Sequence, residues 1–94
     1  MTVRVLEITL PPAELRTQRA FEVRVLIEVD GDTSAFAFTV TDLGLRSSDA
    51  RLVSASPPFV ERFRSTPATL RHVEALVGQA IAGSAVHLPQ LVAA

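Results

Sequence analysis

The sequence contains no cysteine, lysine, asparagine, tyrosine or tryptophan. Without cysteine it can form no disulfide framework and no reactive thiolate, so a domain of this size depends on packing or on a partner subunit for its stability. Lysine and asparagine use A-rich codons, and their joint absence favours a GC-rich bacterial genome, or a phage of such a bacterium, as the source.

An excess of charge of one sign and a long apolar run are also lacking. The net charge of -1 gives no electrostatic basis for general binding to nucleic acid or to an anionic membrane. No stretch is long and apolar enough to cross a bilayer, and residues 1–4 lead directly into alternating residues rather than into a signal peptide. We therefore expect a cytoplasmic protein.

The composition is typical of one globular domain. The 94 residues are 48% hydrophobic and 20% charged, a balance that disordered chains do not have. The sequence shows no linker, internal repeat or low-complexity tract. We predict a single domain over residues 1–94.

The clearest local signal is a β-hairpin over residues 21–41. Apolar and polar residues alternate over 21–29, and Asp30-Gly31 is a typical two-residue hairpin turn. A two-residue turn aligns the apolar positions of the two strands on one face, whereas a three-residue turn would expose one set. The predicted buried face contains Phe21, Val23, Val25, Phe36, Phe38 and Val40.

A further strand is predicted over residues 2–10, ended by Pro11-Pro12. Its apolar residues fall on two parities: Val3 and Val5, then Ile8 and Leu10. The phase therefore slips near Leu6, which indicates either a β-bulge or a strand that is buried on both faces. A short edge strand is also expected over residues 51–55.

The C-terminal half shows helix signals. Ser56 and Thr66 each precede proline, as an N-cap residue precedes proline in a first helical turn. The first signal predicts a short helix with Phe59 and Phe63 on one side. The second predicts a helix over residues 67–82, ended by Gly83. The residues expected to pack this helix on the hairpin are Leu70, Val73, Val77 and Ile81.

These elements together predict an α+β fold. We expect a three- or four-stranded antiparallel meander with the C-terminal helix packed on one face. The alternative is an immunoglobulin-like β-sandwich, which short strands would suit but the C-terminal helical pattern does not.

No motif predicts catalysis, a cofactor or a metal site. Gly78 and Gly83-Ser84 have phosphate-loop spacing, but the lysine is missing and the segment ends a helix. His72 and His87 lie on different predicted elements, without the cluster of ligands that a metal needs. The serines lack a nucleophile-elbow context. The sequence therefore contains no positive indication of an enzyme.

The only basic cluster is Arg62, Arg64 and Arg71, around Phe63. Arginine beside an aromatic ring can contact phosphate and stack on a base. The same residues can also flank a short helix whose phenylalanine belongs to the core. We favour the second interpretation, so nucleic acid is not an expected partner.

The favoured function is a small interaction or assembly module, acting as a homo-oligomeric or accessory subunit. Apolar residues on both faces of the first strand, together with an uncharged tail, exceed what one helix can cover, which favours a symmetric dimer. The competing interpretation is that the tail folds back over its own sheet and closes the core within one chain. The alternative is a small-ligand carrier with a pocket between sheet and helix. The candidate interface residues are Leu6, Leu26, Ala35, Ala37, Leu88 and Leu91.

Overall fold

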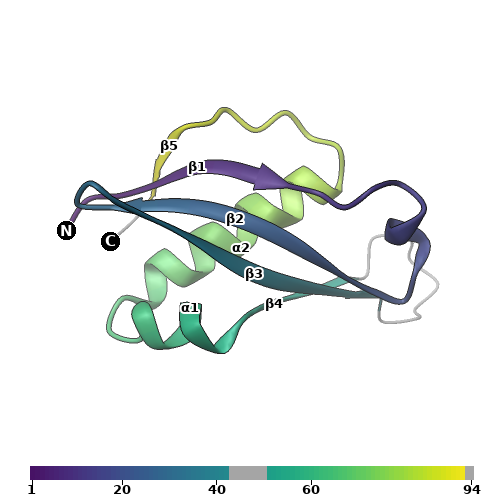
Figure 1. Cartoon of the computed structure of the whole chain (residues 1–94), viewed down its shortest axis with the longest axis horizontal. Helices are drawn as coiled ribbons and strands as arrows, with labels where there is room; N and C mark the ends of the chain where they lie inside the picture. Colours follow the sequence, from purple (N-terminus) through teal and green to yellow (C-terminus); the bar gives the residue numbers. More distant parts are fainter. Residues whose placement is uncertain (43–50, 93–94) are drawn as a thin grey trace.

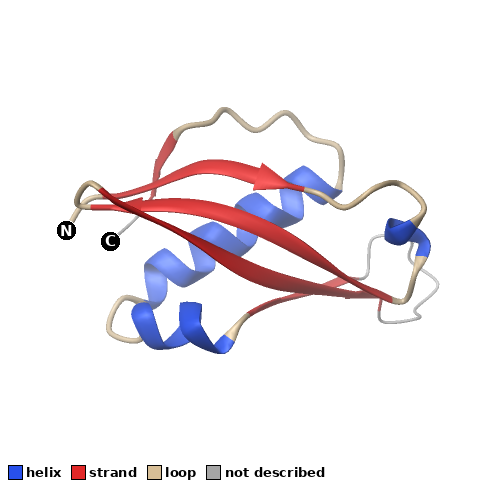
Figure 2. Ribbon diagram, in the orientation of Figure 1, coloured by secondary structure: helices blue, strands red, loops and turns tan. Residues whose placement is uncertain are grey.

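The computed structural model describes residues 1–42 and 51–92, which form one antiparallel sheet with helices on one side (Figures 1 and 2). The five strands have the order β4-β3-β2-β1-β5. In chain order the elements are β1 (Val3–Thr9), the 3-10 turn η1 (Leu15–Thr17), β2 (Ala20–Val29), β3 (Asp32–Asp42), β4 (Arg51–Ala55), α1 (Pro57–Arg62), α2 (Pro67–Ile81) and β5 (Gln90–Val92).

The predicted α+β class is confirmed. The sheet has five strands where the sequence predicts three or four, because residues 90–92 add a strand beside β1. The short edge strand expected over residues 51–55 is present as β4, which pairs with the end of β3. An immunoglobulin-like sandwich needs two sheets, whereas the part of the chain that the structure describes forms one.

The hairpin of β2 and β3 has the predicted register. Phe21 pairs with Val40, Val23 with Phe38 and Val25 with Phe36. Both turn residues have positive φ, 49° at Asp30 and 92° at Gly31, as a type I′ turn requires. The turn also holds the start of β1: the Thr2 backbone N–H donates to Asp30 Oδ1 at 2.8 Å, and the Asp30 N–H donates to the Thr2 carbonyl at 3.0 Å.

The phase slip in β1 is a β-bulge. Val5 pairs with Ile27 of β2, but the next pairing joins Glu7 to Leu26, so Leu6 is the additional residue. Beyond the bulge Ile8 pairs with Val25, whose side chain is fully buried. The bulge therefore brings both apolar sets of β1 to the core face, and the alternative of a strand buried on both faces is wrong.

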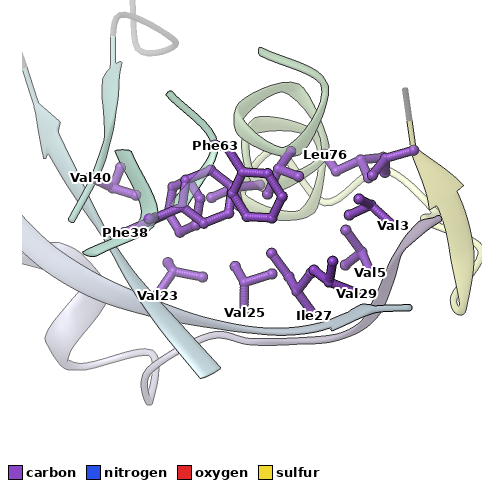
Figure 3. Close-up of a cluster of buried hydrophobic side chains, with 14 of the residues drawn as sticks. Val3, Val5, Val23, Val25, Ile27, Val29, Phe38, Val40, Phe63 and Leu76 are labelled. Carbon is purple, nitrogen blue, oxygen red and sulfur yellow. The ribbon is translucent and has the colours of Figure 1, made fainter. Parts of the chain in front are cut away.

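The core lies between the sheet and α2, as Figure 3 shows for Val23, Val25, Ile27 and Val29 of β2. Helix α2 contacts β1, β4 and β5. Val73 and Val77 are fully buried as predicted, but Leu70 and Ile81 are only half-buried. Leu76 and Thr69 are buried instead, so the apolar stripe of α2 is rotated and wider than predicted.

Four phenylalanine rings fill the core beside α1. Phe59 lies 4.9 Å from Phe38, 5.1 Å from Phe36 and 4.7 Å from Phe63, centroid to centroid. Phe59 and Phe63 are buried on one side of α1, as their spacing predicts. Ser56 and Thr66 are the N-cap residues by position, but neither side chain makes a capping hydrogen bond. The Thr66 hydroxyl donates instead to the Phe63 carbonyl at 3.5 Å.

Helix α2 ends at the predicted glycine with a Schellman motif. The Ser84 N–H donates to the Gln79 carbonyl at 3.0 Å, and the Gly83 N–H donates to the Ala80 carbonyl at 3.2 Å. Gly83 has φ 83°, a conformation that costs a residue with a Cβ atom additional free energy.

Two glycine substitutions in this region are expected to change stability in opposite directions. Gly83→Ala should lower the free energy of unfolding by about 1 kcal/mol, because alanine is strained at this positive φ. Gly78→Ala should raise it by about 0.5–1 kcal/mol, because Gly78 lies inside α2 and an added Cβ would meet nothing within 4 Å. Urea unfolding of both variants measures the difference, and equal shifts of the same sign would contradict the assignment of Gly83 as the helix stop.

Candidate functional site

One side of the sheet is covered by none of the helices in the described part of the chain. We call it the open face and define its centre by Arg24, Leu26 and Glu28 of β2 and by their partners in β3, Ala37, Ala35 and Thr33. These residues alternate with the buried residues of both strands, so they lie on the side away from α2. Figure 1 views the molecule from this side, with the strands in front of α2.

An apolar row crosses the middle of the open face. Leu26 pairs with Ala35 of β3, and on its other side the bulge of β1 places Leu6 and Glu7 opposite it. Leu6 and Leu26 are half-buried and Ala35 is exposed. Ala37 is also half-buried. It pairs with Arg24, and this is the next pair on the same face of the sheet. The sheet thus brings together four residues that the sequence analysis selected from three separate segments.

The two remaining candidates are separated from each other. Leu88 is half-buried and packs against the core of its own chain. Leu91 in β5 is 62% exposed and pairs with Arg4 of β1 on the open face. Leu91 therefore extends the open face toward the β5 edge. Leu88, with Val86 and Val92, packs on the core of its own chain, so this part of the tail folds back as the competing interpretation has it.

The bulge removes part of the argument for a large apolar surface. Val3 and Val5 are fully buried, and Ile8 and Leu10 pack against the same core. The sequence predicts that β1 presents apolar residues on both faces. This is wrong, because the four residues just named all lie on the core side and only Leu6 lies on the open face. The apolar residues of the open face are those of its central row and, at the two edges of the sheet, Leu91 of β5 and Leu52 of β4, which is 51% exposed and pairs with Thr41.

Charged residues of opposite sign flank this row. Glu28, on one side, is half-buried, and its Oε1 atom lies 3.9 Å from Nη1 of Arg4 in β1. Arg24, on the other side, is exposed and has no ion-pair partner among residues 1–42 and 51–92. Arg24 and Glu28 are not among the interface residues predicted from the sequence. The signal that could have identified them is their spacing, two residues to either side of Leu26 on the same face.

The motifs considered for chemistry do not form a site. Gly78 lies inside α2 and Gly83 ends it, so the glycine pair does not connect a strand to a helix as a phosphate loop does. His72 is half-buried on α2 and His87 is exposed beyond it. In the described ranges no three or more histidine, aspartate or glutamate side chains gather into a metal-binding group.

The aromatic ring within the cluster of Arg62, Arg64 and Arg71 is buried and not exposed to solvent. Phe63 is 1% exposed and belongs to the core, with the Arg62 guanidinium 5.6 Å from its ring centroid. Arg64 forms an exposed ion pair with Glu61 at 4.0 Å. Because Phe63 is buried, it cannot stack on a base, which is consistent with the preferred interpretation of these residues as the outer side of a core helix.

Comparison with protein-family models, with curated proteins and with solved structures finds no match to this chain. Across the described residues, no helix has both the length and the apolar character needed to span a membrane.

Proposed function

We propose that this protein is a small interaction or assembly module that acts as a homo-oligomeric or accessory subunit, and that its open face pairs with a second copy. The observation that supports this proposal is the apolar row of Leu6, Leu26 and Ala35, over which no helix of residues 1–42 and 51–92 lies. An apolar row rimmed by charged and polar residues is typical of a protein interface. A two-fold dimer is the commonest assembly of identical chains.

The rest of the domain supports the same proposal. The chain has no disulfide, and its single core is built from one sheet face. Additional burial from a partner would stabilise a domain of this size. The joint absence of lysine and asparagine favours a bacterial source with a GC-rich genome, and the setting that we propose for this role is cytoplasmic.

The alternative, a small-ligand carrier, has no specific observation in its favour. The space between the sheet and α2 contains fully buried side chains such as Val25, Ile27 and Val77. In the described part of the chain, every buried side-chain nitrogen and oxygen has a hydrogen-bond partner. None of these groups is therefore left unpaired to orient a ligand.

Sedimentation equilibrium tests the proposal directly. At micromolar concentration we expect the wild-type chain to have the mass of a dimer, in equilibrium with monomer on dilution. Leu26→Glu should shift the mass to that of the monomer, because it places a charge in the centre of the proposed interface.

Val60→Glu is the matched control. Val60 is 45% exposed on α1, on the helical side of the sheet, and the same change there should leave the mass unchanged. A wild-type chain that stays monomeric throughout the micromolar range would overturn the proposal.

A further inference from the structure

The charges on the open face have a pattern that selects one mode of pairing. Arg24 and Glu28 lie on the same side of β2, each two residues from Leu26. Two residues along a strand span about 7 Å, so the two charges lie at equal distances on either side of the apolar row. Strand β2 is the central strand of the sheet, so a partner centred on Leu26 overlaps the open face most completely.

We propose that two copies pack open face to open face about a two-fold axis that runs across the strands, along the row of Leu26 and Ala35. This inference rests on the proposed self-association and specifies its geometry. The axis reverses the strand direction of one copy relative to the other. Leu26 then meets Leu26 of the second copy, and Arg24 of each copy meets Glu28 of the other. Glu7, which pairs with Leu26 in the same row, meets Glu7 of the second copy.

The other way to stack the two faces is disfavoured by charge. An axis parallel to β2 would place Arg24 against Arg24 and Glu28 against Glu28 of the second copy. Like charges brought together in an interface weaken binding strongly. The axis across the strands replaces both repulsions with attractions and leaves one like-charge contact, between Glu7 and Glu7 of the second copy, so it is the two-fold arrangement that charge favours.

The geometry of the two side chains suits this pairing. Packed sheets align their strands within about 30° of each other, so residues one pair away from the axis are displaced by only a few ångströms, which arginine and glutamate can span. Arg24 has no ion-pair partner within the described residues of its own chain. Glu28 already lies 3.9 Å from Arg4, and the second copy would give it a second arginine.

Two charge-reversal variants test the arrangement. Arg24→Glu alone would place two glutamates against each other at both contacts, and Glu28→Arg alone would do the same with arginines. We expect each variant to dimerise at least about tenfold more weakly than wild type. An equimolar mixture of the two should form a heterodimer with near wild-type affinity, because both contacts then join glutamate to arginine.

Native mass spectrometry of the mixture identifies the heterodimer, since the two variants differ in mass. The double variant Arg24→Glu/Glu28→Arg should also recover dimerisation, because it exchanges the charges within one chain. Arg71→Glu is the control: it reverses a charge on the exposed side of α2, on the helical side of the sheet and away from the proposed contacts, and should leave the dimer unchanged. Circular dichroism of each variant establishes that it is folded.

The outcomes separate the two proposals. A wild-type dimer whose two single variants do not recover on mixing would overturn this two-fold arrangement and leave the proposed function standing. A wild-type monomer would overturn both.

Discussion

Replacing Phe38 with alanine is expected to lower the free energy of unfolding by about 3–5 kcal/mol, the usual loss for a buried phenylalanine. Its side chain is fully buried in β3, its ring centroid lies 4.9 Å from that of Phe59, and it pairs across the sheet with Val23. A small domain has a total stability of about 5–15 kcal/mol. Urea unfolding followed by circular dichroism should show a much lower midpoint, or an unfolded chain.

Phe36→Ala is the control for this prediction. Phe36 lies on the same strand and the same face and also contacts Phe59, at 5.1 Å, but it is only half-buried. Its replacement removes less apolar surface from the core, and the loss of stability should be smaller. If the two variants lost the same stability, the core would not be centred on Phe38.

Val77→Asp is expected to prevent folding at neutral pH. Val77 is fully buried on α2, among the aliphatic residues that pack against the sheet. An ionised carboxylate there would have no partner, and the free-energy cost of burying it is comparable with the total stability of the domain. The far-ultraviolet circular dichroism spectrum should be that of an unfolded chain.

Ala75→Asp places the same side chain on the exposed side of the same helix. The expected loss there is only the difference in helix propensity, about 0.5–1 kcal/mol. A Val77→Asp protein that melted like Ala75→Asp would show that α2 does not pack on the sheet through this face.

The hairpin could be predicted because its evidence is local and redundant. The alternation over residues 21–29 defines a face, Asp30-Gly31 defines the turn, and the parity across the turn defines the register. All three signals agree, and the pairing of Val23 with Phe38 follows from them. The helix stop at Gly83 is local in the same way, since only the positive φ of one residue decides it.

Features that depend on tertiary context could be predicted only in part. The slip at Leu6 was compatible with a bulge or with burial on both faces, and only the neighbouring β2 decides between them. Leu76 and Thr69 are buried because of the angle at which α2 crosses the sheet, which periodicity alone does not determine. The three residues of β5 have no pattern of their own, and they form a strand because β1 offers an open edge.

In the candidate site, too, some residues could be predicted from the sequence and others depend on tertiary context. Leu26, Ala35 and Ala37 stood out because they are small or apolar residues on an otherwise polar face, and the structure places them together. Leu88 shares their apolar character but packs against the core, because the chain folds back after α2. Arg24 and Glu28 resemble ordinary solvated residues in the sequence. Their symmetry about Leu26 becomes apparent only when the open face is viewed as a surface.

The pairing of β5 with β1 has a consequence for the order of folding. Val3 pairs with Val92, so the first of the described strands to be synthesised pairs with the last of them. The hairpin can form from neighbouring residues, but Val3, Arg4 and Val5 at the outer edge of β1 have no strand partner until β5 has been synthesised. Closing a loop of this length opposes the step entropically. The nascent domain therefore exposes a sheet edge for most of its synthesis, and a chain that stalls before residue 90 presents that edge to other proteins.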